Sequence, residues 1–523
     1  MGKIIRKSTN CHKNMITSQT NIRLGRGQLY NFLNKNIKEF NPYIISTLSI
    51  IFLVLVGIVS YKVNTTYAVF TDTIMGTKTI EITVKSGKLD TSGANAPVLD
   101  EGMIPVYYDE SSSSWKKADE KNKDENHKWY DYNSKMWANS VTVVSDNRSK
   151  YLSAEVGTKI PMADILTMQV WIPRYKYKVW NYNADGTKTS NPQEIEIMFE
   201  KGIDKTGEIT CTDNIQGSGG NGTSETCKLD NKVCTDSTCN GKTYTHPAFT
   251  FGDEEIKGFW MSKFELRYEK YSVDVSKPNI GDVYNSFSVS AGYKVAMNMS
   301  ANNNDYGFST NTDTHMIKNM EWGAVAYLSH SKYGTCTDGS CVEVGINNNS
   351  DFITGCGAEP SSSGSSDCNE YNTSIGMLAS TTQNVYGVYD MSGSMSEYTM
   401  SNIVSSDGTT MMSGFDSSSN SGYTGIIYDN GNYSLYTGTD YPDNKYYDKY
   451  SYITSSSISS TKIMSKLGDG IKEVYKSNYS GWYNHSSRLA DYRYPWFRRG
   501  IFYSDGYYGS GEDSISSRFI ITP

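Results

Sequence analysis

Eight cysteines in the middle of the 523-residue chain have the spacing of a disulfide framework. An even number of cysteines in polar loops is typical of an oxidising environment, where disulfides persist. Zinc is the alternative, because thiolates also bind metal, but no histidine lies at ligand spacing from Cys234-x4-Cys239. We expect disulfides, and nearest-neighbour pairing is one of many possible connectivities. The pairs would be Cys211 with Cys227, Cys234 with Cys239, Cys336 with Cys341, and Cys356 with Cys368.

A second group of side chains, near residue 500, has the composition of a binding surface. Tyrosine and arginine provide large contact areas with hydrogen-bonding ends, and they are enriched at interface hot spots and in antibody-like paratopes. Tyrosine rings also stack on sugar rings through their apolar faces. The alternative is that about half of these residues pack in the core, with Arg499 in a structural ion pair. The predicted ligand-binding residues are Trp496, Arg498, Arg499, Tyr503, Asp505, Tyr507 and Tyr508.

Other chemistry has little support in the sequence. The six histidines are scattered without the spacing of a metal site, and no glycine-rich phosphate loop is present. Acidic residues are abundant, but no pair of carboxylates stands out. The formal net charge is −7, and an acidic chain is unsuited to a sequence-independent grip on nucleic acid. We therefore expect neither an enzyme nor a nucleic-acid-binding protein.

The elements that position these residues are predicted to be mainly short strands joined by polar loops. Residues 169–179 alternate well enough for a strand. Residues 258–271 indicate a strand that turns into a helix. The clearest helical spacing lies in residues 315–333, where Thr314 or Asp313 would cap the helix.

An uncharged run at residues 43–61 has about the length of a helix that crosses a bilayer. The tail before it, residues 1–42, holds eight Lys or Arg and one acidic residue, so the N-terminus is predicted to be cytoplasmic. A cleaved signal peptide is the alternative to a signal anchor. We expect a single-pass cell-membrane protein with the bulk of the chain extracellular. That bulk would comprise a small β-rich module (62–150) and a main domain (155–523) with a disulfide-stapled insertion (202–245).

Four segments resemble, in order and spacing, the formylglycine-generating enzyme or sulfatase-modifying factor family. They are GFWMSKFEL (258–266), MIKNMEWGAVAYL (316–328), NVYGVYDMSGSMSEYT (384–399), and Arg499-Gly500 with the closing SSRFIIT (516–522). The resemblance implies an α+β, C-type-lectin-like fold with much irregular structure. This fold is also used for ligand display, including the target proteins of diversity-generating retroelements.

The resemblance also bears on cofactors. Enzymes of the family bind copper through a C-terminal pair of cysteines, and this sequence has no cysteine after Cys368. The family's loop at 390–399 often binds calcium, which makes Ser394 and Glu397 candidate calcium ligands. Ser394 replaces the usual Asn, however, and a calcium-free turn fits the loop as well.

The same loop has a second interpretation. Asp390-Met391-Ser392-Gly393-Ser394 matches the D-x-S-x-S motif with which von Willebrand factor A domains hold a divalent cation. Their doubly wound fold needs alternating strands and helices, which the following residues do not indicate. The leading hypothesis is a membrane-anchored, surface-displayed binding or adhesion protein with a non-catalytic domain and a protein or glycan ligand. Alternatives are a cation-dependent adhesin, an enzyme with an unrecognised site, and a structural envelope protein.

Overall fold

The computed structural model describes most of residues 89–523 and few residues before them. The chain divides into two units, residues 1–89 and 90–523. The described ranges are 66–67, 85–86, 89–178, 194–211, 215–217, 227–230, 232–233, 241–269, 273–281, 287–357, 366–404, 415, 426–429, 432–435, 441–451, 462–464, 466–470, 496–500, 506–507 and 515–523.

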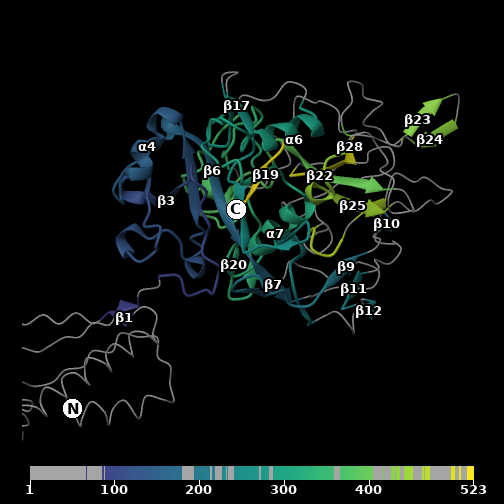
Figure 1. The fold of residues 1–523 in the computed structure, drawn as a ribbon, viewed down its shortest axis with the longest axis horizontal. Helices are drawn as coiled ribbons and strands as arrows, with labels where there is room; N and C mark the ends of the chain where they lie inside the picture. The colour runs from purple at the N-terminus through teal and green to yellow at the C-terminus, as the bar shows by residue number, and fades with distance from the viewer. Residues whose placement is uncertain are drawn as a thin grey trace, which may run out of the picture. The chain divides into compact units, whose positions relative to one another are not determined.

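A seven-stranded sheet, in which every neighbouring pair is antiparallel, lies at the centre of residues 90–523 (Figure 1). Its first strands come from residues 104–143, so the sheet continues across the predicted boundary between a 62–150 module and a 155–523 domain. In spatial order the strands are β19 (Asp313–Met316), β30 (Phe519–Thr522), β16 (Gly258–Ser262), β6 (Ile165–Pro173), β5 (Asn139–Val143), β3 (Ile104–Asp109) and β4 (Ser114–Lys117).

Strand β6 is buried along its whole length, because the sheet is covered on both faces. Apolar side chains of this kind each contribute about 1.5–3 kcal/mol when fully buried. The polar residues of β6 are bonded to β5. The hydroxyl oxygens of Thr142 and Thr167 lie 2.5 Å apart, and Ser140 Oγ donates to Gln169 Oε1 at 3.2 Å.

A second, mixed sheet carries the segments named in the sequence predictions. Its order is β25 (Asp448–Ser451), β22 (Ser396–Val404), β27 (Trp496–Arg499) and β28 (Gly506–Tyr507), and β29 (Ile515–Ser516) also pairs with β22. Strand β22 is parallel to β25 and β29 but antiparallel to β27.

The α-helices among the described residues are α4 (Ser145–Ser153), α6 (Val289–Asn298) and α7 (Asn319–Ser329). Helix α6 contacts both β19 and β22, so it joins the two sheets (Figure 1).

Short strands complete the described structure. Two three-stranded sheets have the orders β13 (Thr243–Thr245), β7 (Tyr175–Lys178), β8 (Ile197–Phe199), and β12 (Lys232–Val233), β11 (Cys227–Leu229), β9 (Ile209–Cys211). The paired strands are β1 (Thr66–Tyr67) with β2 (Lys85–Ser86), β10 (Ile215–Gly217) with β26 (Lys462–Met464), β14 (Thr250–Phe251) with β15 (Glu254–Glu255), β17 (Arg267–Glu269) with β18 (Val273–Val275), β20 (Cys336–Thr337) with β21 (Ser340–Cys341), and β23 (Ile426–Asp429) with β24 (Asn432–Leu435).

Two local predictions are confirmed only in part. The helix predicted in 315–333 exists as α7, but residues 313–316 pair with β30 as a strand, so the predicted cap is wrong. Instead, a Glu321 carboxylate oxygen accepts the Lys318 backbone N–H at 2.8 Å. This bond satisfies one of the N–H groups that the first turn of a helix leaves without a partner. The strand predicted from residue 258 is β16, but the helix predicted after it is wrong, since 267–269 pair with β18.

The predicted α+β, C-type-lectin-like fold class is wrong, because the described residues are mostly β with few helices. Aromatic and β-branched runs pair over long sequence distances here, and this pairing outweighs local helical spacing.

The prediction of a transmembrane anchor is corrected as well. The described residues include no helix that is long and apolar enough to span a bilayer. The longest described α-helix, α7, is about 16 Å long, whereas a hydrocarbon core is about 30 Å thick. The predicted span 43–61 and tail 1–42 lie outside the described residues. The predicted membrane keywords and single-pass cell-membrane localisation therefore lack support, and they have no part in the proposals below.

Candidate functional site

A row of aromatic rings from separate segments forms a continuous feature beside α6, which we call the aromatic ribbon. Neighbouring ring centroids lie from 5.3 Å apart (Tyr293 to Phe415) to 6.1 Å apart (Tyr441 to Trp496). Most of the rings meet edge to face or tilted, an arrangement that contributes about 0.5–1.5 kcal/mol per pair beyond burial. In order the ribbon comprises Phe251, Tyr446, Tyr293, Phe415, Tyr441 and Trp496.

The ribbon has a buried side and a side that reaches solvent. Phe415 and Trp496 are buried, whereas Tyr293, Tyr441 and Tyr446 are only half-buried. The exposed residues 443–444 border the half-buried tyrosines. Apolar ring surface therefore lies next to hydrogen-bonding groups, which is the composition of many ligand sites.

A histidine clasp holds one end of the ribbon in place. His315 on β19 is fully buried, and its Nδ1 lies 2.8 Å from Asp313 Oδ1 while its Nε2 lies 3.0 Å from Glu321 Oε1. The Phe251 ring stacks on the imidazole at 4.7 Å. Asp313 Oδ2 accepts hydrogen bonds from Tyr446 Oη at 2.8 Å and from Lys445 Nζ at 3.0 Å. The clasp thus fixes η9 (Asn444–Tyr446) to the edge of the central sheet.

The charges of the clasp are set by these contacts. Burial disfavours the imidazolium, but Glu321 and Asp313 outweigh it and raise the pKa of His315 above its ordinary value. Burial likewise disfavours the Asp313 carboxylate, but hydrogen bonds from His315, Tyr446 and Lys445 lower its pKa to about 2. The pKa of Glu321 is also lowered, because Lys318 and His315 together outweigh burial.

A second set of charged residues, which we call the ion cluster, lies in the core beneath loop 390–395. Glu265 pairs with Arg267, and Glu397 Oε1 lies 2.6 Å from Arg518 Nε, with all four side chains fully buried. Burial raises the pKa of Glu265 to about 8, against the opposing charge of Arg267. Carboxyls with raised pKa values are candidate acids or bases. Here their oxygens bond to protein, and Glu265 Oε1 also accepts the Met395 N–H at 3.1 Å.

The structure brings the predicted calcium ligands Ser394 and Glu397 into this cluster. Ser394 Oγ accepts from Arg267 Nη2 at 2.9 Å, and Glu397 Oε2 accepts from Trp322 Nε1 at 3.2 Å. Their oxygens therefore face donors, and calcium binding at these residues stays a prediction.

Asp390, the cation-binding residue of the adhesin interpretation, has both carboxylate oxygens in hydrogen bonds to the protein. Asp390 Oδ1 accepts from Asn347 Nδ2 at 2.9 Å, and its Oδ2 accepts from Gly355 N at 2.8 Å. Burial raises the pKa of Asp390. No α-helix follows α7 in the described part of the chain, so the alternating helices of a doubly wound fold are not seen there.

The predicted C-terminal ligand residues are divided by the structure. Trp496 and Arg499 are fully buried, and Arg498 is 9% exposed. The Arg499 guanidinium lies 3.8 Å from the Trp322 ring and donates to Asn319 Oδ1 at 2.9 Å. Tyr507 is described only as part of β28, and Tyr503, Asp505 and Tyr508 lie outside the described residues.

The cysteine predictions are confirmed where they are described, with disulfides Cys336–Cys341 and Cys356–Cys368. Cys211 lies opposite Cys227 in the β9–β11 register, and Cys234 and Cys239 lie outside the described residues. Cys336 and Cys341 also form, with His330, the one group of three close His, Cys, Asp or Glu side chains that the described residues contain. Because both sulfurs form a disulfide, that group is not a thiolate metal site.

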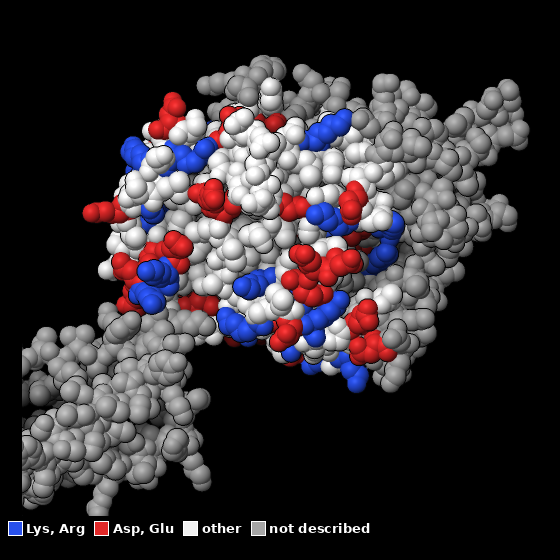
Figure 2. All heavy atoms as spheres, in the orientation of Figure 1, with Lys and Arg blue, Asp and Glu red and all other residues white. Residues whose placement is uncertain are grey.

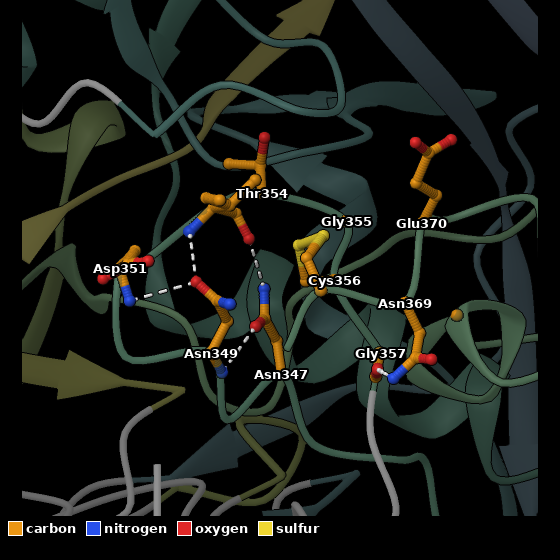
Figure 3. Close-up of a disulfide and its surroundings, with 12 residues drawn as sticks. Asn347, Asn349, Asp351, Thr354, Gly355, Cys356, Gly357, Asn369 and Glu370 are labelled. Carbon is orange, nitrogen blue, oxygen red and sulfur yellow. Dashed lines mark hydrogen bonds between the residues drawn. A yellow bond between two sulfur atoms is a disulfide. The ribbon is translucent and has the colours of Figure 1, made fainter. Parts of the chain in front are cut away.

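The Cys356–Cys368 disulfide lies next to an asparagine-rich loop, residues 346–351 (Figure 3). Asn347 Oδ1 accepts the Asn349 N–H at 3.2 Å, and Asn349 Oδ1 accepts the Asp351 N–H at 3.0 Å. These side-chain oxygens replace a regular backbone ladder, so the loop is ordered without strands.

The surface charges on the visible face do not form an area of one sign. Figure 2 shows Lys and Arg interspersed with Asp and Glu, around a broad area of uncharged side chains. Such a face provides no continuous basic track for a nucleic-acid backbone.

Sequence reasoning did not identify the ribbon or the clasp. Their residues come from segments far apart in the chain, and only the run YPDNKYYDKY (441–450) concentrates tyrosine strongly enough to be a signal. Neither a protein-family model nor a curated protein matches this chain.

Proposed function

We propose that residues 90–523 form a non-catalytic binding domain whose ligand, a protein or a glycan, contacts the tyrosine edge of the aromatic ribbon. The observation that carries the proposal is the row of half-buried tyrosines, Tyr293, Tyr441 and Tyr446, backed by buried rings and bordered by exposed polar residues. Tyrosine offers a large, rigid contact area with a polar end, so it binds at low entropic cost.

The non-catalytic part of the proposal is supported by the ion cluster. Its carboxylates lie in the core, and Glu265 and Glu397 both pair with arginines. We expect carboxylates paired in this way to position the core rather than to meet a substrate.

The test compares two ribbon tyrosines with a similar tyrosine elsewhere. Full-length, labelled protein would be applied to an immobilised glycan array and to whole cells. The ribbon variant Tyr293→Leu with Tyr441→Leu should weaken binding at least about tenfold, equivalent to about 1.4 kcal/mol. The control Tyr107→Leu replaces a half-buried tyrosine of β3 and should bind as the parent does. Equal loss in both variants, or no binding of the parent to either probe, would contradict the proposal.

A further inference from the structure

We propose that His315 makes the aromatic ribbon pH-sensitive: its protonated ring fixes residues 443–448 to β19 and α7, and deprotonation loosens them. The clasp itself stands on the geometry of the described residues. Its effect on ligand binding rests on the proposed function.

The first step is the number of N–H groups on the ring. Both ring nitrogens of His315 face carboxylate oxygens, of Asp313 at 2.8 Å and of Glu321 at 3.0 Å. A neutral imidazole has a single N–H, so only the imidazolium donates to both carboxylates. Deprotonation therefore leaves one carboxylate, fully buried Glu321 or half-buried Asp313, facing a nitrogen lone pair, and such an unsatisfied contact is costly.

Both carboxylates connect to the same segment of chain. Asp313 holds Lys445 and Tyr446 directly. Glu321 closes the first turn of α7, and in that turn the Met320 N–H donates to Asp448 Oδ2 at 2.8 Å. Loss of the hydrogen bond to either carboxylate therefore weakens a connection to residues 445–448.

The remaining charged groups around the ring bond to the same two carboxylates. At the residue before α7, Lys318 Nζ lies 3.5 Å from Glu321 Oε1, the oxygen that also faces the ring, so Glu321 keeps this ion pair when His315 is neutral. From η9, Lys445 Nζ donates to Asp313 Oδ2, whereas the ring bonds to the other carboxylate oxygen, Oδ1. From β25, Asp448 is half-buried near Lys318, and desolvation of its carboxyl raises its pKa.

Among the residues that the structure describes, the other elements packed against the ring bring no further charged side chain to it. From β14, Phe251 covers the ring and carries no charge, and the ammonium groups of Lys318 and Lys445 lie 5.0 and 4.9 Å from the Phe251 centroid. The titratable groups near the ring also include two tyrosine hydroxyls, Tyr293 from α6 and Tyr446 from η9. Burial raises the pKa of each.

The sign of the pH effect follows from the direction of the shift. The pKa of His315 is higher in the folded state than the ordinary value of about 6.5. Its stabilising contribution is therefore complete below about pH 6.5 and is lost as the pH rises through the folded pKa. Residues 443–448 should be held against β19 and α7 at acidic and neutral pH and less firmly held at alkaline pH.

Amide hydrogen exchange of the full-length chain tests the clasp without any ligand. Between about pH 6 and pH 9, protection of peptides that cover residues 441–450, corrected for the intrinsic rate, should fall at least about tenfold, because a charge-assisted hydrogen bond is lost. His315→Gln should remove this pH dependence. The control His127→Gln replaces a half-exposed histidine that pairs with Asp124 at 2.6 Å, and it should behave as the parent does.

A second variant covers the case in which His315→Gln does not fold. Tyr446→Phe keeps the histidine, so protection of 441–450 should be lower at every pH while the pH dependence remains. Protection that is independent of pH in the parent, or pH dependence that survives in folded His315→Gln, would overturn the clasp. The two proposals can fail separately. If the clasp is pH-dependent but the ribbon variants bind as the parent does, the proposed function is overturned and the clasp is not.

Discussion

The buried ion pair between Glu397 and Arg518 is the contact of the ion cluster whose loss should be most costly. In Glu397→Gln the side chain keeps its shape but loses its charge, and the Arg518 guanidinium remains buried without its anion. Breaking a buried pair in this way typically costs about 3–5 kcal/mol. Arg518 keeps its backbone acceptors on Ser262, Lys263 and Tyr389, so we expect about 3 kcal/mol. Total stabilities are about 5–15 kcal/mol, so the loss should be plain.

The assay is urea unfolding of the full-length, oxidised protein, followed by tryptophan fluorescence and by circular dichroism so that coincidence of the two transitions can be checked. The control is Glu196→Gln, which breaks an exposed pair with Lys178 at 3.0 Å. It should change the free energy of unfolding by about 0.5 kcal/mol or less. The double variant Glu397→Gln with Arg518→Met removes both charges, so it should be more stable than the single variant.

Two results would refute this reasoning. A cost below about 1 kcal/mol would mean that Glu397 is already uncharged in the folded protein, in keeping with the upward shift that burial gives its pKa. A double variant no more stable than the single one would show that the guanidinium was never left uncompensated.

Two further predictions concern Gly393 in loop 390–395 and the Cys356–Cys368 disulfide. At Gly393 φ is 83°, and a Cβ there would lie 2.1 Å from the Asn347 carbonyl oxygen. Gly393→Ala should therefore destabilise the protein by about 3 kcal/mol or more. Gly339 has a φ of 79° and no atom within 4 Å of such a Cβ. Gly339→Ala should accordingly cost only about 1.5 kcal/mol in the same denaturation assay. Replacing Cys356 and Cys368 together by Ser should lower the free energy of unfolding by about 3 kcal/mol, and a drop below about 1 kcal/mol would show that this disulfide adds little to the stability of the fold.

Local patterns predicted local structure. The apolar spacing within residues 315–333 indicated a helix, of which 319–329 form α7, and the close cysteine pairs indicated the two described disulfides. The strand at 258–262 was also predicted, since aromatic residues there fit a buried strand.

Long-range partners were beyond this reasoning. Trp496 and Arg499 have the composition of a binding surface, yet they are buried because Asn319, Trp322 and the ribbon rings surround them. The sequence around residues 496–499 carries no signal that would identify those distant partners. The same limit applies to the ribbon and to His315, whose two carboxylates serve as partners only because β19 and α7 meet at that corner.

The place of β30 in the central sheet also affects how the chain can be made. This strand lies between β19 and β16, and Arg518 Nη1 donates to the Ser262 carbonyl 256 positions earlier in the chain. During translation, β16 and β19 leave the ribosome well before residues 519–522 exist. Until then the edge of β16 that β30 covers is open, and β19 lacks its pairing with β30; open strand edges of this kind pair with other chains. We therefore expect the nascent protein to be most prone to pairing with other chains in the interval before residues 519–522 are synthesised.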